Sequence, residues 1–359
     1  MSIEVSGIQK RFGGATAVSG VDIDLPAGRM LVLLGPSGCG KTTTMRCIAG
    51  LESPDTGTIS IHGTKVFDRA AGIDVPVWKR NVGMVFQSYA IWPHMTVFEN
   101  VAFPLEMQRL PARERHDRVM EVLEKVGLAD YAKRGASALS GGQMQRVALA
   151  RSLVMRPSVL LFDEPLSNLD ARLRDRLRVQ LRELQTELNI TGIYVTHDQQ
   201  EALAVADQIM VMDRGAVRQI GAPVELYHAP ATSAIAAFLG YSNIFPAAEW
   251  RAAEGGYDVT LANGRRLRAT GGAQPPGSEA ALCIRPEDLA LRAAAPGETG
   301  LVGDVTLASF LGAFMLYRVR LGEDEVWEVI SRDVLQGIGN GSRVTIEARP
   351  EAMKLLPAR

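Results

Sequence analysis

The 359-residue sequence is short of cysteine, of net charge and of long apolar runs. Its three cysteines, Cys39, Cys47 and Cys283, are too few for a disulfide framework, which indicates a reducing compartment. The 39 Lys and Arg nearly balance the 40 Asp and Glu, so the basic excess of a nucleic-acid-binding protein is missing. No run of about 18 apolar residues occurs, and the first residues show no secretory signal. We therefore expect a cytosolic protein that neither spans a membrane nor binds nucleic acid.

The first two thirds of the chain alternate short apolar runs with helical segments. The runs at 30–34, 82–86, 159–162 and 193–195 have polar, Gly or Pro neighbours, which is typical of strands buried on both faces. This alternation predicts an α/β domain with a mainly parallel sheet, which we place at residues 1–238. Residues 88–155 interrupt the pattern with prolines and a charged helical segment, and we predict a helical subdomain there.

The composition changes near Gly240, where short alternating runs separated by turn residues begin. The pair Asn263-Gly264 between two such runs predicts a hairpin. Residues 239–359 are therefore predicted to form a small all-β domain, either a barrel or a sandwich.

A glycine-rich segment directly follows the apolar run at 30–34 and precedes a helical stretch. It satisfies G-x-x-x-x-G-K-[ST], the pattern in which backbone N–H groups hold phosphate oxygens at a helix N-terminus. The lysine of the pattern would reach the β- and γ-phosphates of a nucleotide, and the hydroxyl after it would bind Mg²⁺. The alternative is a plain glycine turn before a helix. The predicted phosphate-binding residues are Gly35, Pro36, Ser37, Gly38, Cys39, Gly40, Lys41, Thr42 and Thr43.

Two carboxylates end the apolar run at 159–162. Asp163 is predicted to hold Mg²⁺, and Glu164 to act as the general base on an attacking water. Without a phosphate site nearby, the same pair would be read as acidic residues that cap a loop.

A second anion site is predicted at 139–146, where Ser140 is a good N-cap for the helical stretch that follows. The segment Leu139-Ser140-Gly141-Gly142-Gln143 resembles the signature motif LSGGQ of the ABC transporter ATPase family. The resemblance implies a homodimer in which Ser140, Gly142 and Gln143 of one copy face ATP on the other.

Further family elements are similar in order and spacing across residues 1–220. Gln87 resembles the glutamine that joins Mg²⁺ to the transporter interface, and His197 the histidine that contacts the γ-phosphate. Asp170 lies in a segment that resembles the D-loop, and Phe12 matches the aromatic that stacks on adenine. Taken singly, three of these residues have another interpretation: Gln87 as a polar residue at a strand end, His197 as a structural histidine and Phe12 as a core residue.

The tail resembles the C-terminal OB-like (TOBE) domain of importer ATPases, most clearly at Ile284-Arg285-Pro286-Glu287. A plain strand and turn with a surface ion pair would also explain that segment. The resemblance implies a motor subunit at the cytoplasmic face of the inner membrane, with a separate permease and, indirectly, a solute-binding protein. Iron(III), polyamine or phosphonate is the solute class it suggests. A non-transport ABC ATPase of DNA repair or translation is the alternative function. The tail would serve either as a dimerisation scaffold, which we favour, or as a sensor of a small ligand.

Overall fold

The computed structural model describes residues 2–271, 279–322 and 325–358. The chain forms two compact units, Met1–Leu226 and Tyr227–Arg359. The division lies before the domain boundary that we predict at residues 238 and 239. The reason is that helix α8 (Ser233–Phe238) belongs to the second unit, where its Ala236 packs with Cys283 and Leu356 of the β-structure.

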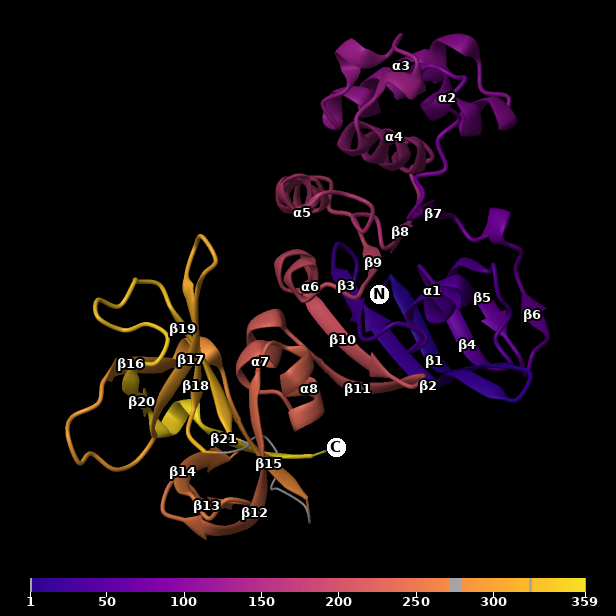
Figure 1. The fold of residues 1–359 in the computed structure, drawn as a ribbon. Helices are drawn as coiled ribbons and strands as arrows, with labels where there is room; N and C mark the ends of the chain where they lie inside the picture. Colours follow the sequence, from indigo (N-terminus) through magenta and orange to yellow (C-terminus); the bar gives the residue numbers. More distant parts are fainter. Residues whose placement is uncertain (1, 272–278, 323–324, 359) are drawn as a thin grey trace. The chain divides into compact units, whose positions relative to one another are not determined.

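The first unit contains an antiparallel and a mainly parallel sheet (Figure 1). The antiparallel sheet has the order β2-β1-β4-β5-β6, and the second sheet has the order β11-β10-β3-β9-β8-β7, with only β11 antiparallel to its neighbour. The predicted parallel sheet is confirmed, and its four predicted strands are present with ends that differ by at most one residue. The strands are β1 (Ile3–Phe12), β2 (Ala15–Leu25), β3 (Met30–Leu34), β4 (Thr56–Ile61), β5 (Thr64–Asp68), β6 (Ile73–Asp74), β7 (Val82–Val85), β8 (Val159–Asp163), β9 (Gly192–Thr196), β10 (Gln208–Asp213) and β11 (Ala216–Gly221).

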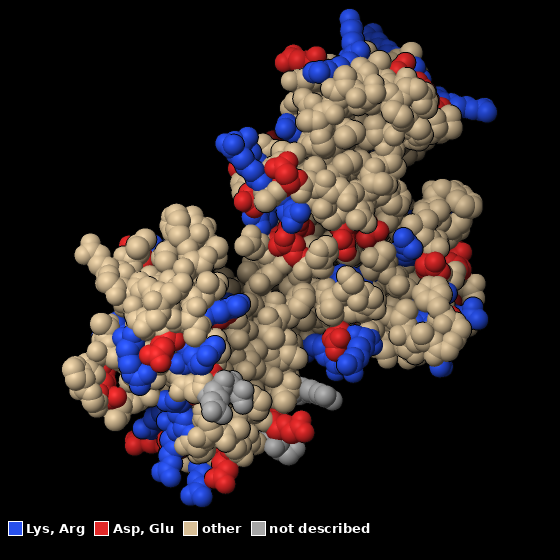
Figure 2. All heavy atoms as spheres, viewed as in Figure 1, with Lys and Arg blue, Asp and Glu red and all other residues tan. Residues whose placement is uncertain are grey.

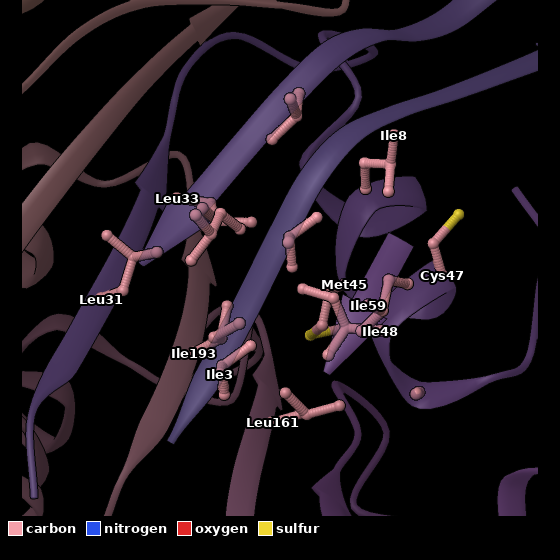
Figure 3. Packing of buried hydrophobic residues seen from close by; sticks show 14 of the residues in the cluster. Ile3, Ile8, Leu31, Leu33, Met45, Cys47, Ile48, Ile59, Leu161 and Ile193 are labelled. Atoms are coloured by element: carbon pink, nitrogen blue, oxygen red, sulfur yellow. The ribbon is translucent and has the colours of Figure 1, made fainter. Parts of the chain in front are cut away.

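One apolar cluster joins both sheets to the first helix (Figure 3). Met45 and Ile48 of that helix are fully buried, in one cluster with Ile59 of the antiparallel sheet and Leu33 of the parallel sheet. Burying side chains of this size stabilises the unit by about 1.5–3 kcal/mol each. The helix is therefore held from both sides, and its N-terminus is fixed at the carboxyl end of β3. The helices of this unit are α1 (Lys41–Ala49), α2 (Val97–Met107), α3 (Ala112–Lys125), α4 (Gly141–Leu153), α5 (Ala171–Glu187) and α6 (Gln199–Val205), and α7 (Pro223–His228) crosses the division.

The segment predicted as a helical subdomain contains α2, α3 and α4. Thr96 begins α2 with a capping box, because its hydroxyl accepts from the Glu99 N–H while the Glu99 carboxylate accepts from the Thr96 N–H. The same two-way arrangement begins α4 at Ser140. Both helix starts are therefore encoded locally by residues three apart.

The second unit is built around two β-structures, a closed barrel with the order β12-β13-β14-β21-β15 and a five-stranded sheet with the order β16-β20-β17-β18-β19. The predicted hairpin is present, since Thr260 pairs with Arg266 across the turn at Asn263-Gly264. The all-β, OB-like prediction is confirmed for the part of this unit that follows α8, whereas α8 and the last residues of α7 are helical parts of the unit. The strands are β12 (Asn243–Ala253), β13 (Gly256–Leu261), β14 (Arg266–Gly271), β15 (Ala280–Ile284), β16 (Leu289–Ala293), β17 (Val302–Phe310), β18 (Met315–Arg320), β19 (Val326–Ser331), β20 (Arg343–Ala348) and β21 (Lys354–Pro357).

Arg285 is a buried residue of the second unit that forms an ion pair at 3.6 Å with the carboxylate of Glu287, which is 42% exposed. Its guanidinium lies 3.3 Å from the centroid of the Tyr227 ring and 4.2 Å from that of Tyr241. It donates to the carbonyls of Tyr227 and Leu239, and its side chain is only 4% exposed. Arg285 therefore ties the segment before β12 to the barrel.

The surface of the molecule mixes both signs of charge. Figure 2 shows Lys and Arg interspersed with Asp and Glu on the face that it presents, as the balanced composition predicts. Among the described residues, no helix is both long and apolar enough to cross a membrane.

Candidate functional site

The predicted phosphate loop lies between β3 and α1, where two of its glycines are required by space. A Cβ on Gly35 would lie 2.2 Å from the Met212 carbonyl oxygen, and one on Gly40 2.2 Å from that of Ala17. Gly40 has a φ of 103° and is the N-cap of α1, where no side chain accepts from the first N–H groups. These N–H groups and the helix dipole are therefore available to an anion.

Lys41 is folded back over this loop. Its ammonium donates to the carbonyls of Gly35 at 2.7 Å and Pro36 at 2.9 Å, and the residue is 5% exposed. Cys39 is buried with its sulfur 3.7 Å from the same ammonium. The loop therefore holds a positive charge at the start of α1, where phosphate oxygens would meet it.

Thr42 and Asp163 meet at the carboxyl end of the parallel sheet. The Thr42 hydroxyl donates to Asp163 Oδ1 at 3.2 Å, and Asp163 is the last residue of β8. Burial raises the pKa of Asp163, and the hydrogen bond from Thr42 offsets part of this rise. Among the described residues no cluster of three or more His, Cys, Asp or Glu could hold a metal. One hydroxyl and one carboxylate fit Mg²⁺, which is usually bound by few protein ligands together with phosphate oxygens and water.

Glu164 points away from Asp163 toward His197. Its Oε2 lies 3.1 Å from His197 Nδ1, and its N–H donates to the Val195 carbonyl of β9. Glu164 has a φ of 44°, a left-handed conformation that costs roughly 1–2 kcal/mol for a residue with a Cβ. This strained backbone turns the second carboxylate away from the first, so that the two can serve different tasks.

The remaining predicted residues of the same site lie at element ends. Gln87 follows β7, and its carbonyl accepts from the side-chain amide of Asn168 at 3.0 Å. Asp170 caps α5 by accepting from the Leu173 N–H. Phe12 ends β1 and is 48% exposed with the Lys10 ammonium 5.2 Å from its ring centroid, so its interpretation as a core residue is wrong.

The signature residues lie apart from the phosphate loop. Ser140 and Gln143 form the capping box of α4, and Gly142 packs where a Cβ would lie 3.2 Å from the side chains of Leu173 and Leu177. In the described part of the chain, no hydrogen bond or ion pair joins Ser140, Gly142 or Gln143 to residues 35–43. The structure thus brings together Thr42 with Asp163 and Glu164 with His197, but not the two predicted anion sites.

Two positions near Gln87 were not predicted from the sequence. Asn168 holds the Gln87 carbonyl, and Arg151 of α4 donates to the carbonyls of Tyr89 and Ala90. Tyr89 and Ala90 have φ values of 59° and 48°, so Arg151 stabilises two consecutive left-handed residues. The position of Asn168 within the D-loop-like segment was a usable signal, whereas nothing in the local sequence marks Arg151.

Comparison with known proteins agrees with this geometry. Residues 18–167 match the ABC transporter family, and residues 282–356 match the TOBE domain. An Fe(3+) ions import ATP-binding protein of Rhizobium etli is 43% identical over 99% of this chain and 98% of that protein. A spermidine/putrescine import ATP-binding protein of Thermobifida fusca is 43% identical over 95% of this chain and 89% of that protein.

A solved structure shows the same fold. The cbiO1 protein of Clostridium perfringens, described as part of an ABC transporter complex, is 30% identical with a TM-score of 0.57 and covers 63% of this chain and 90% of its own. The phosphate loop, the two carboxylates with their separate partners, and these relatives along nearly the whole length lead to one conclusion. The chain belongs to the ABC transporter ATP-binding family, as an ATPase with a C-terminal TOBE domain.

Proposed function

We propose that this chain is the ATP-hydrolysing subunit of an importer that works at the cytoplasmic face of the membrane with a separate permease and a solute-binding protein. The names of the relatives along the whole chain support this proposal, because they are import ATP-binding proteins for Fe(3+) ions and for spermidine and putrescine. The observation that supports ATP hydrolysis is that two neighbouring carboxylates beside one phosphate loop have different partners. Asp163 accepts from Thr42, and Glu164 lies against His197.

In the proposed site, residues of this chain bind the nucleotide and its Mg²⁺. The N–H groups at the start of α1 and the Lys41 ammonium would bind the β- and γ-phosphates, and exposed Phe12 would stack on adenine. Thr42 and Asp163, with Gln87, would hold Mg²⁺, which when bound neutralises charge that develops on the phosphoryl group.

Glu164 would accept the proton of the attacking water, and His197 would orient Glu164 from its other side. We expect Glu164→Gln to lower turnover by roughly a hundredfold or more, because the amide cannot accept a proton. ATP binding should remain, since Glu164 makes no contact with the phosphate loop among the described residues. Glu183→Gln on the exposed side of α5 is the matched control. Near-normal ATP hydrolysis by Glu164→Gln would contradict the assignment.

A second copy completes the proposed site. Because Ser140, Gly142 and Gln143 have no contact with their own phosphate loop, we propose that they bind the γ-phosphate held by a partner in a head-to-tail dimer. Glu164→Gln should then elute as a dimer in ATP and as a monomer without it. The further change Ser140→Arg, which places a bulky side chain at the α4 N-terminus, should abolish that ATP-dependent dimer, and persistence of the dimer would contradict the arrangement.

An apolar groove next to Gln87 is the proposed permease contact. Its volume is about 610 Å³, and its lining includes Trp78, Phe86, Trp92 and Phe103 together with Arg151. Trp78 is 78% exposed and Phe86 38%, which is unusual for aromatic side chains unless a partner covers them. A short helix from a permease loop is the occupant that fits an apolar groove whose lining also contains two cations, Lys79 and Arg151.

No residue of this chain is proposed to select the transported solute, so an experiment has to identify it. The purified chain with its co-expressed permease would be assayed for ATP hydrolysis with binding protein loaded with Fe³⁺ or with spermidine. Stimulation by one loaded form supports the importer and identifies its cargo. Robust hydrolysis without stimulation by any solute, and without co-purification of the permease, would contradict the transport proposal and leave the ATPase activity intact.

A further inference from the structure

Arg174, the fourth residue of α5, reaches two loops of the hydrolysis site. Its Nη2 donates to the Leu169 carbonyl at 3.0 Å, and its Nη1 donates to Asp198 Oδ2 at 3.3 Å. Leu169 directly precedes Asp170, and Asp198 directly follows His197. One guanidinium therefore joins the loop before α5 to the loop that presents His197.

Hydrogen bonds of Asp198 also fix the loop that presents His197. Asp198 uses its second oxygen, Oδ1, to cap α6 by accepting from the N–H groups of Gln200 and Glu201. Asp198 also donates its own N–H to the Thr196 hydroxyl at 2.9 Å. The residues on both sides of His197 are thus fixed by hydrogen bonds. We call Thr196, Asp198 and Glu201 the frame of His197, because the position of His197 depends on theirs.

A buried carboxylate anchors that frame. Glu201 is 2% exposed and accepts from the hydroxyls of Tyr194 at 2.8 Å and Thr196 at 2.9 Å. Arg174 Nε lies 3.9 Å from the other Glu201 oxygen and has no hydrogen-bond partner among the described residues. Arg174 therefore supplies positive charge to both carboxylates of the frame, Asp198 and Glu201, while it binds the loop at Leu169.

We propose that Arg174 is a positioning residue for ATP hydrolysis, which holds His197 against Glu164 and makes that contact depend on the loop at Leu169-Asp170. The inference rests on the roles proposed above for His197 and Glu164. Loss of the guanidinium would let the two loops move separately, and a displacement of about 1 Å is enough to reduce catalysis strongly. The loop at Leu169 also contains Asp170, so a displacement of that loop would reach His197 through Arg174.

An arginine is required for this geometry. Its planar fork directs two Nη donors at two acceptors from different loops, whereas a lysine has one nitrogen at the end of a flexible stem. Arg174→Lys is therefore expected to keep the charge but to restore only part of the turnover that Arg174→Met loses.

The test compares Arg174→Met and Arg174→Lys with Arg176→Met, an exposed arginine on the same helix. We expect Arg174→Met to lower kcat about tenfold with KM for ATP within about twofold, because the phosphate loop does not contact Arg174. Its melting temperature should stay near that of the native protein, since the side chain is 29% exposed. A kcat within about twofold of the native value, or an equal loss in Arg176→Met, would overturn the proposal.

A double-mutant cycle separates positioning from general damage. Asp198→Asn keeps an oxygen to cap α6 but removes the charge that Arg174 binds. If the link carries the effect, Arg174→Met combined with Asp198→Asn is no slower than the slower single variant. Losses that multiply would overturn the link.

His197→Ala, measured in parallel, separates the role proposed for His197 from the role proposed for Arg174. Near-normal turnover of His197→Ala would refute the role proposed for that residue. An inactive His197→Ala together with a fully active Arg174→Met would overturn the Arg174 inference alone.

Discussion

Arg80 caps the end of the helix whose beginning forms the phosphate site, and its removal should destabilise the first unit. The guanidinium donates to the carbonyls of Cys47 and Ile48 in the last turn of α1, to Val75 and to Asp74. The side chain is 0% exposed, and burial lowers the pKa of its guanidinium. Gly50, the residue after α1, lies so close that a Cβ there would be 2.4 Å from Arg80 Nε.

The expected cost of Arg80→Met follows from these contacts. Cys47 keeps a bond from the Gly50 N–H, so the buried Ile48 carbonyl and the part-buried Val75 carbonyl lose the Arg80 guanidinium as donor. Each buried acceptor without a partner costs about 1–3 kcal/mol, and relief of the buried charge returns part of it, which leaves a net loss of about 3 kcal/mol. For a unit of this size the melting temperature should fall by about 6–12 °C.

Thermal unfolding followed by circular dichroism measures this loss, with the transition of the first unit identified by its shift on addition of ATP. Lys79→Met, an exposed neighbour, is the control. Asp74→Asn should cost less than about 1 kcal/mol, because Asp74 is 46% exposed and the ion pair is solvated. If Asp74→Asn costs as much as Arg80→Met, or if Arg80→Met melts within about 2 °C of the native protein, the helix-cap explanation is refuted.

Three further results are expected. Gly40→Ala should weaken ATP binding at least about tenfold, because its Cβ would collide with the Ala17 carbonyl, whereas Gly13→Ala, also at positive φ but in open space, should bind ATP normally in the same titration. Arg285→Met should lower the stability of the second unit by about 3 kcal/mol in thermal unfolding, since two carbonyls and two aromatic rings lose their cation; an unchanged melting curve would contradict this. Burial raises the pKa of Cys283 from 9.0 to about 12, so its contribution to stability is complete below pH 9 and is lost as the pH rises toward 12. Cys283→Ser should reduce the loss of stability between pH 9 and 11, and the native thiol should resist iodoacetamide at pH 8; rapid native-state alkylation would show that the thiol is accessible.

The parts of the fold that were predictable are those with a local signal. The strand before the phosphate loop, the glycine pattern itself and the capping residue Ser140 are each encoded within a few neighbouring positions. The sequence also places Asp163 and Glu164 at the end of a strand, and the ends of parallel strands share one edge of a sheet. For the same reason Thr42 could be expected near Asp163.

The arginines that organise the site could not be predicted in this way. Arg80, Arg151 and Arg174 bind backbone carbonyls 5 to 62 positions away, and a carbonyl has no signature in the sequence. The exposed Phe12 and the buried Arg285 reverse what residue type suggests, because tertiary neighbours rather than hydropathy decide each case. The antiparallel sheet of the first unit was likewise missed, since its pairing of β1 with β4 joins segments about fifty residues apart.

The barrel of the second unit has a consequence for the order of events during synthesis. Strand β21 pairs with both β15 and β14, yet all the strands of the neighbouring sheet, β16 to β20, lie between β15 and β21 in the sequence. While the ribosome is still making those strands, β14 and β15 each present an unpaired edge that can recruit another nascent chain. The first unit, whose last sheet strand ends at Gly221, can fold as it emerges, whereas the barrel can close only after β21 has left the exit tunnel. A stalled or shortened message that ends before β21 would therefore yield a folded ATPase unit joined to an aggregation-prone half-barrel.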